Sequence, residues 1–384
     1  MTAPFQLLLP PRILFGRGEA GKTAGLAAGL SRSAFLVHGR DAARAGWLIR
    51  DLETAGVAVT PFACPKEPDL PLLEAALAAA RSCGAGVVLG LGGGAAIDLA
   101  KAVAGLAPGQ GAVLDHLEGV GRALPLTATP LPFIALPTTA GTGSEATKNA
   151  VIDVPAHRRK VSLRDDRMMA RVAIVDPALT DGCPRGVTLA SGLDALTQVI
   201  EPYLCARPNP ATDALARAAI PQGMSALVRL MEGEDTAARD AMAWVSLAGG
   251  IALANAGLGA VHALAGVIGG MTGAAHGAIC GTLLPFVLQA NAQALPPNHP
   301  VRARFEEVDA LLSAGFGPAP GPAPGSAALH AWSRKAGLPG LDALGLQKDS
   351  HPAVAEAALS ASSMRANPVA LPVEALCQVL AAAS

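Results

Sequence analysis

The sequence predicts an α/β domain followed by an all-helical domain, and three observations lead to this prediction. Short, continuously apolar runs alternate with Ala-rich helical patterns in the first half of the chain, which is typical of a parallel sheet covered on both faces. The last clear strand is Val172–Pro177, and beyond it every strong pattern is helical. We therefore place a domain boundary near residue 182, between an α/β domain (1–182) and an all-helical domain (183–384).

The individual elements follow from apolar runs and helical periodicity. In the first domain we expect strands at Ala34–Val37, Val57–Val59, Gly86–Gly90, Phe133–Leu136 and Val172–Pro177, with helices at Leu70–Ser82 and Ala95–Gly105. In the second domain we expect helices at Leu189–Leu204, Ala211–Met231, Thr236–Asn255, Leu258–Gly270, Ala353–Ser362 and Val373–Ala382.

Composition excludes several classes of function. The 384 residues are 51% hydrophobic and 15% charged, with 29 basic against 30 acidic residues, so no basic footprint for nucleic acid or for a membrane surface is present. Aromatic residues make up only 3% of the chain, which is too few for a surface that stacks single-stranded bases. The six cysteines show no paired spacing and no signal peptide precedes them, so we expect a cytoplasmic protein with reduced thiols.

A long uncharged stretch, Ala241–Val301, has the length of a membrane span. It is dominated by Ala and Gly, it contains His262 and His276, and no basic cluster or aromatic belt flanks it. We interpret it as buried helices of a large core and expect no membrane association.

Two loops after predicted strands carry the features of a nucleotide site. In the first, glycines around Gly92–Gly94 form a tight turn before a helix, where free N–H groups and the helix dipole favour a pyrophosphate. Gly90, Gly92 and Ala95 fit the GxGxx(G/A) fingerprint, a weak signal alone. In the second, five hydroxyl residues and two glycines occupy the ten residues after Pro137, a loop suited to phosphate or ribose.

Possible metal ligands occur in the predicted helical domain. Asp194 and Gln198 are four residues apart and share one helix face. His262 and His276 lie in the uncharged stretch. Spacing alone does not establish that these side chains converge, since a single histidine in apolar surroundings is more often a core residue.

Six motifs in order make the chain recognisable. They read GGG-xxx-D-x-A-K, PTTAGTGSEAT, VDP, GLDALT-x-x-IEPY, GxVHALA and HGAICGTLLP. Together they resemble the iron-containing (group III) alcohol dehydrogenase family over nearly the whole length, from Arg12 to Pro368. The resemblance implies a Rossmann-like dinucleotide-binding domain and a helical metal and substrate domain, with the active site in the cleft between them, a fold shared with dehydroquinate synthase. It implies an NAD(P)-dependent alcohol dehydrogenase or aldehyde reductase acting on a small alcohol or aldehyde.

The resemblance also implies roles for particular residues. Asp194, His262 and His276 match catalytic and metal-binding positions of the family, whose metal is held by one Asp and three His. The cofactor-binding positions are Gly39, Arg40, Gly93, Gly94, Ala95, Asp98, Thr138, Thr139, Thr142, Asn149, Lys160 and Leu179.

The sequence departs from the family at two histidine positions. Gln198 occupies a metal-ligand position, and Gly266 occupies the position of a histidine near the nicotinamide. A carboxamide is a weak ligand, so the metal, Fe²⁺ or Zn²⁺, is expected to be weakly held. The related maleylacetate reductases suggest an alternative in which a metal-free enzyme uses His262 or His276 for proton transfer. A non-catalytic cofactor-binding homologue is a third reading, and a dehydroquinate synthase-like reaction is disfavoured by the uncharged stretch.

Two further expectations concern the cofactor and the assembly. Gly39 stands where the family often has an Asp that repels the 2′-phosphate, and Arg40 follows it, so we expect NADPH to be used at least as well as NADH. The apolar segment Phe5–Leu9 either forms an edge strand of its own sheet or pairs with a second copy, and we expect a homodimer or larger oligomer.

Overall fold

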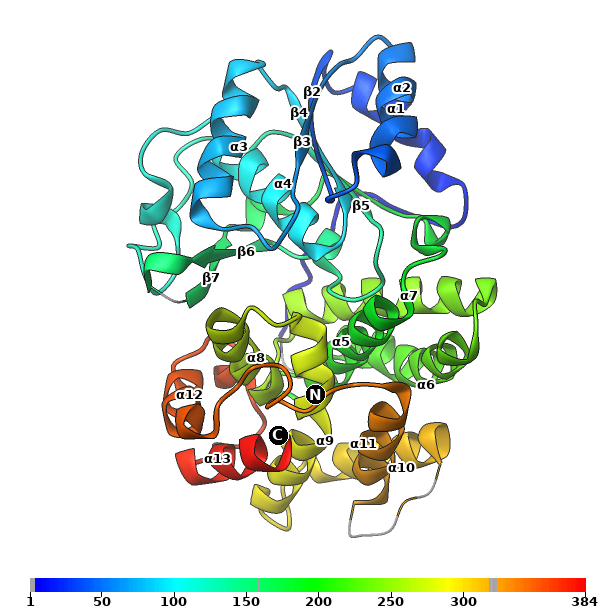
Figure 1. Ribbon diagram of the computed structural model, residues 1–384, viewed down its shortest axis with the longest axis vertical. Coiled ribbons are helices and arrows are strands. Elements are labelled where there is room, and N and C mark those ends of the chain that lie inside the picture. The colour runs from blue at the N-terminus through cyan, green and yellow to red at the C-terminus, as the bar shows by residue number, and fades with distance from the viewer. Residues whose placement is uncertain (1–3, 158, 318, 320–322) are drawn as a thin grey trace. The chain divides into compact units, whose positions relative to one another are not determined.

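The computed structural model describes residues 4–157, 159–317, 319 and 323–384, and the chain divides into two compact units (Figure 1). The α/β unit comprises Leu8–Thr139 and Gly143–Asp181. The helical unit comprises Gly182–Ser384 together with Ala140–Thr142 and the N-terminal segment that ends at Leu7. The predicted fold class, a parallel α/β region followed by an all-helical region, is confirmed.

The α/β unit is built on a six-stranded parallel sheet with the order β1-β8-β5-β4-β2-β3. The chain runs from β2 to β3 on one side and returns to β4 on the other side of β2, so the strand order reverses between β2 and β4. The strands are β1 (Ile13–Phe15), β2 (Ser33–His38), β3 (Ala58–Ala63), β4 (Val87–Gly92), β5 (Phe133–Pro137) and β8 (Val172–Val175).

Helices cover both faces of this sheet, as the apolar strands predict (Figure 1). Successive side chains of β2 point to opposite faces. Phe35 packs with α3 (Leu70–Ser82) and α4 (Gly94–Leu106), whereas Leu36 packs with α1 (Thr23–Ala28) and α2 (Gly46–Thr54). The two faces therefore hold separate apolar clusters, and the expected strands and helices are present with ends that coincide or shift by up to four residues.

An antiparallel hairpin, β6 (Asn149–Val154) and β7 (Arg159–Arg164), was not predicted. In β6 every second residue is buried, and Ala150, Ile152 and Val154 join the apolar cluster that contains α4. The segment escaped prediction because its alternating pattern differs from the continuous apolar runs that mark the central strands.

The helical unit contains the predicted helices and further ones between them. The uncharged stretch folds into α7, α8 and α9, whose side chains fill a large apolar core with α5. Its helices are α5 (Arg185–Leu204), α6 (Pro210–Glu232), α7 (Thr236–Asn255), α8 (Ala260–Thr272), α9 (His276–Ala294), α10 (Arg302–Phe316), α11 (Pro324–Ala336), α12 (His351–Leu359) and α13 (Val373–Ala382).

Among the described residues, no single helix is both long enough and apolar enough to span a membrane; α7 and α8 pass that test only as a pair, which bends by 99° at its break. The segment Phe5–Leu9 forms no strand in the described chain, which excludes the alternative of an edge strand in its own sheet. Its apolar side chains are exposed, by 48% at Phe5, 41% at Leu7 and 40% at Leu9. All six cysteines are free thiols.

Candidate functional site

Three helices of the helical unit bring four potential ligands together. Asp194 comes from α5, His262 from α8, and His276 and Cys280 from α9. One ligating atom from each lies within 4.8 Å of every other. We call this group the four-donor cluster. Asp194 Oδ1 is 3.5 Å from His262 Nε2 and 4.0 Å from His276 Nε2, so the residues of three separate sequence motifs converge on one point.

The start of α8 is fixed by two polar side chains. Glu201, seven residues and two turns after Asp194 on α5, accepts a hydrogen bond from the Val261 backbone N–H at 2.7 Å. Asn367 accepts one from Ala260 at 3.0 Å. These bonds satisfy N–H groups that a helix end otherwise leaves unpaired. A Cβ at Gly259 would lie 2.8 Å from Glu201 Oε1, so only glycine allows this close approach.

Glu201 also orients His262. Its Oε2 lies 2.6 Å from His262 Nδ1, which directs the opposite ring nitrogen, Nε2, toward Asp194. Both His262 Nε2 and Asp194 Oδ1 are buried and make no hydrogen bond with the described residues; at 3.5 Å they form an ion pair when His262 is protonated. Burial alone would lower the pKa of His262, but the Glu201 and Asp194 carboxylates outweigh it and raise the pKa to about 9. Burial opposes ionisation of Asp194, yet His262 and His276 hold its pKa below the ordinary value.

His276 and Cys280 are one helical turn apart at the start of α9, with Cys280 Sγ 3.5 Å from His276 Nε2. Between them, Gly277 allows α9 to approach α5 closely: a Cβ there would stand 2.3 Å from the Ala190 carbonyl oxygen and 3.0 Å from Asp194 Cβ. This contact holds the Cys280 thiol against Asp194. Burial, followed by the charge of Asp194, raises the pKa of the thiol well above its usual range.

The four-donor cluster fits a divalent cation. A carboxylate, two imidazoles and a thiol are the donor types that bind Zn²⁺ or Fe²⁺. A buried polar atom without a partner costs free energy, and two such atoms lie 3.5 Å apart here, on Asp194 and His262. A cation between them would satisfy both, and Glu201 would serve as the carboxylate behind the ligating histidine.

Gln198, the predicted weak ligand, lies one turn after Asp194 on α5 and is also buried. Its Nε2 donates to the Gly141 carbonyl at 3.0 Å, so the side chain is held by the loop Ala140–Thr142. Gly266 lies one turn after His262 on α8, and a Cβ there would meet no atom within 4 Å. The space directly beside Gly266 is therefore open.

In the α/β unit, loops that follow β2, β4 and β5 lie side by side. The Gly39 N–H donates to the Leu91 carbonyl at 3.3 Å, and the Thr138 N–H donates to Gly92 at 2.9 Å. A Cβ at Gly93 would lie 3.2 Å from Thr139 Oγ1. These loops stand at the carboxyl ends of parallel strands where the strand order reverses, which is where open α/β sheets bind nucleotides.

The N-terminus of α4 faces this point. Gly93 is extended and precedes the helix, Gly94 and Ala95 form its first turn, and no side chain caps it. First-turn N–H groups without a side-chain cap suit an anion such as a pyrophosphate. Arg40, proposed for cofactor choice, and the next residue, Asp41, have protein partners: the Arg40 guanidinium donates to the Pro65 carbonyl at 3.1 and 3.3 Å, and Asp41 accepts from the Ala43 N–H at 2.9 Å. Asp41 is thus occupied as a helix cap.

Other predicted cofactor residues lie within protein networks. Asp98 accepts hydrogen bonds from the Ser144 hydroxyl and the Val151 N–H, and lies 3.9 Å from Lys101 Nζ. The Asn149 carbonyl accepts from Lys101 at 2.8 Å. The rest are dispersed: Lys160 on β7 pairs with Glu67, Leu179 packs against the α1–α2 side of the sheet, and Thr142 belongs to the helical unit.

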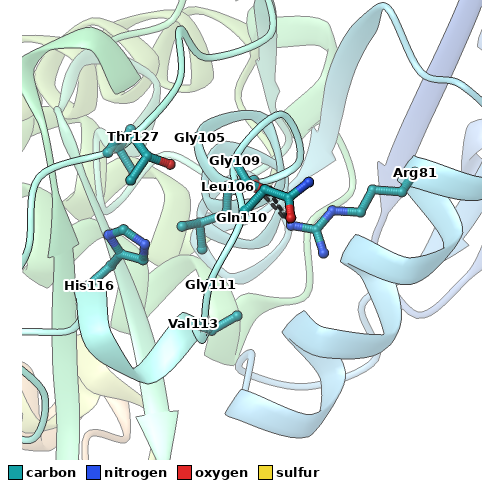
Figure 2. Close-up of a pocket in the computed structure, with 10 residues that line it drawn as sticks. Arg81, Gly105, Leu106, Gly109, Gln110, Gly111, Val113, His116 and Thr127 are labelled. Atoms are coloured by element: carbon teal, nitrogen blue, oxygen red, sulfur yellow. Dashed lines mark hydrogen bonds between the residues drawn. The ribbon is translucent and has the colours of Figure 1, made fainter.

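A small cavity near the end of α4 is separate from these loops (Figure 2). The Arg81 guanidinium, from α3, donates to the carbonyls of Leu106, Ala107 and Gly109 at 3.0 Å each and caps the C-terminus of α4. The cavity measures about 10 Å³, room for about one water molecule, so it is no substrate pocket.

Sequence reasoning missed two residues of the helical site, Cys280 and Glu201. Each had a signal in helical spacing: Cys280 is four residues after His276, and Glu201 is seven after Asp194. Both were read only as parts of motifs, and the interhelical contact between Glu201 and His262 has no sequence signature.

Comparisons with known proteins agree over the whole chain. Residues 10–177 match the family described as iron-containing alcohol dehydrogenase, and residues 188–384 match its C-terminal part. The chain is 36% identical over 313 residues to the probable alcohol dehydrogenase EutG of Escherichia coli, which covers 81% of this chain and 76% of that protein. It is 31% identical over 387 residues to the NAD-dependent methanol dehydrogenase of Bacillus methanolicus, covering 97% and 98% of the two chains.

Among solved structures, the crystal structure of a 1,3-propanediol oxidoreductase superposes with a TM-score of 0.87 at 28% identity, and the match covers 100% of both chains. The chain thus matches both the N-terminal and the C-terminal part of the family, and it matches relatives over nearly its full length. The chain belongs to the iron-containing alcohol dehydrogenase family and is an oxidoreductase that acts on CH–OH groups.

Proposed function

We propose that this protein is an NAD(P)-dependent alcohol dehydrogenase or aldehyde reductase that uses a divalent cation, Fe²⁺ or Zn²⁺, held by Asp194, His262 and His276. The supporting observation is the pair of buried atoms, Asp194 Oδ1 and His262 Nε2, which make no hydrogen bond with the described residues and face each other beside His276. In the oxidative direction a hydride leaves the alcohol carbon for the nicotinamide, the hydroxyl proton is released, and an aldehyde forms. A bound cation supplies polarisation of the alcohol oxygen, which lowers the pKa of the hydroxyl.

The chain's own residues hold and orient this site. Asp194 supplies the negative charge, and Glu201 keeps a proton on His262 Nδ1 so that Nε2 is free to ligate. The open position at Gly266 leaves room for a substrate bulkier than ethanol. We further propose that residues 183–384 form the metal and substrate domain and residues 1–182 the dinucleotide-binding domain.

For the cofactor, we propose that Gly93, Gly94 and Ala95 hold the pyrophosphate at the start of α4. Thr138, Thr139 and Thr142 would then line the nicotinamide end, with Asn149, Lys160 and Leu179 at further lining positions and Asp98 holding the loop. The methanol dehydrogenase relative is named NAD-dependent. The proposed use of NADPH by this chain has two reasons. A Cβ added at Gly39 would lie in open space, and the adjacent Arg40 carries a guanidinium suited to a phosphate.

A metal-free reductase is the second candidate. His262 favours it, because a pKa of about 9 keeps the imidazole protonated at neutral pH while no cation is present, as a proton donor to a carbonyl oxygen requires. The two candidates differ in their response to chelation, since only the metal-dependent enzyme loses activity when its metal is removed.

The function is tested by following absorbance at 340 nm with NADH or NADPH and a panel of aldehydes, then with NAD⁺ or NADP⁺ and the corresponding alcohols. We expect cofactor turnover that Asp194→Asn lowers at least a hundredfold. The exposed Asp51→Asn on α2 is the matched control and should retain wild-type rates. No turnover with any substrate of the panel would argue for a non-catalytic binding protein.

We also propose a homodimer or larger oligomer. The apolar side chains of Phe5, Leu7 and Leu9 are exposed, so a second copy is a suitable neighbour for them. Light scattering at micromolar protein should give at least twice the monomer mass, and a monomeric mass would exclude this assembly.

A further inference from the structure

The four-donor cluster contains a thiol, Cys280, in addition to the three proposed metal ligands. Cys280 lies fully buried on α9, one turn after His276. A buried cysteine is often only a small apolar side chain. Here its Sγ is instead directed at polar atoms: it lies 3.5 Å from His276 Nε2 and belongs to the set of ligating atoms that stay within 4.8 Å of one another.

The distances suit coordination. Ligand bonds of about 2.0–2.3 Å in a tetrahedral site give edges of roughly 3.3–3.8 Å between neighbouring ligand atoms. Cys280 Sγ to His276 Nε2 and Asp194 Oδ1 to His262 Nε2 are both 3.5 Å, and Asp194 Oδ1 to His276 Nε2 is 4.0 Å. Three separations therefore lie within or close to the range of a metal-centred tetrahedron.

The remaining candidate for a fourth ligand is Gln198. Its amide nitrogen is engaged with the Gly141 carbonyl, and a carboxamide is the poorer donor for a transition metal. Asp194 Oδ1 and His262 Nε2, both buried and without a hydrogen bond to the described residues, independently mark a cation position beside Cys280.

We propose that the thiolate of Cys280 is the fourth protein ligand of this site, in place of the missing histidine, and that it makes the site select Zn²⁺ over Fe²⁺. The inference rests on the proposed metal site at Asp194, His262 and His276. On binding, the S–H bond breaks, the S–Zn bond forms and the proton passes to solvent. A thiolate favours zinc more than a third imidazole does. Catalytic zinc expands in some enzymes to five ligands, and the same expansion would give an alcohol oxygen a position beside four protein ligands.

The test uses the full-length protein stripped of metal and reloaded with Co²⁺, a spectroscopic substitute for Zn²⁺. A Co²⁺–thiolate bond produces near-ultraviolet charge-transfer absorption, which oxygen and nitrogen ligands do not. We expect one Co²⁺ per chain and this band in the wild type. In Cys280→Ser the band should vanish while Co²⁺ still binds, and the affinity for Zn²⁺ should fall more than tenfold. Cys377→Ser, on α13, is the matched control and should keep the band.

The outcomes separate this inference from the proposed function. Stoichiometric Co²⁺ without the band in the wild type would overturn the Cys280 ligand and leave the three-residue site standing. No Co²⁺ or Zn²⁺ bound at all would overturn the metal site itself. A second measurement does not depend on how the variant folds: X-ray absorption of the Zn²⁺-loaded wild type should contain one sulfur at about 2.3 Å, and a shell of nitrogen and oxygen alone would contradict the proposal.

Discussion

Lys101 is buried completely in the α/β unit, and its replacement by Met tests what holds the segment after β5. Its ammonium donates to the Ser144 carbonyl, Thr147 Oγ1 and the Asn149 carbonyl at 2.7, 2.8 and 2.8 Å, and lies 3.9 Å from Asp98. Burial lowers its pKa to about 8, against the opposing charge of Asp98, so the group keeps its charge at pH 7.

Lys101→Met keeps the volume but leaves Asp98 without its cation and removes every hydrogen bond of the ammonium, including a further one to the Ser144 hydroxyl at 3.1 Å. Removing one partner of a buried ion pair costs about 3–5 kcal/mol. For a folding unit of about 150–250 residues, 1 kcal/mol corresponds to about 2–4 °C, so we expect the melting transition of the α/β unit to fall by about 6–20 °C.

The assay is differential scanning calorimetry at pH 7, which resolves the transitions of two units. Lys148→Met is the matched control, because Lys148 pairs with the exposed Asp166 and such surface pairs contribute about 0–1 kcal/mol. If Lys101→Met melts within about 2 °C of the wild type, the ammonium does not hold this segment and the reasoning fails.

Three further predictions concern single residues. Burial raises the pKa of Glu145 from 4.5 to about 7, and its Oε1 makes no hydrogen bond with any described residue. The folded chain therefore retains a proton that the unfolded chain releases between pH 4.5 and 7. Over that window the free energy of unfolding, measured with urea, should fall by about 3 kcal/mol more in the wild type than in Glu145→Gln. The same pH dependence in both proteins would contradict this. Gln198→His adds an imidazole on the Asp194 face and should raise the metal that each chain retains after dialysis against a chelator; elemental analysis without a gain would refute the shared geometry. Gly39→Asp should shift preference toward NADH by about tenfold, or ~1.4 kcal/mol, in kcat/KM. If the wild type prefers NADH by more than about tenfold and the variant has the same preference, residues other than Gly39 determine the choice of cofactor.

The central strands and most helices could be predicted because their residues carry local signals. The run around Phe35 is apolar on both faces of the sheet, and Leu70–Ser82 keeps helical periodicity to its last residue. β1, with three residues, is too short to stand out, and α9 contains Gly277, Gly281 and Pro285, which weaken a helical signal although packing makes the helix stable.

The candidate site was predictable in part for the same reason. Asp194, His262 and His276 stand in motifs, whereas the contacts that make them a site connect residues far apart in the chain, such as Glu201 with His262. A sequence gives spacing along one helix but not which faces of two helices meet. Arg40 is an example, because it donates a hydrogen bond to the carbonyl of Pro65, which follows the neighbouring strand β3, and the sequence does not show that the two residues are in contact.

Metal content and activity measured on the same preparations test the central proposal most directly. The protein is dialysed against a chelator, assayed at 340 nm with an active aldehyde, and reassayed after addition of Zn²⁺ or Fe²⁺ under exclusion of oxygen. A metal-assisted enzyme at Asp194, His262 and His276 predicts that activity falls with the bound metal and returns when about one ion per chain is restored. Full activity in protein shown to be free of metal would contradict it and favour proton transfer by histidine alone.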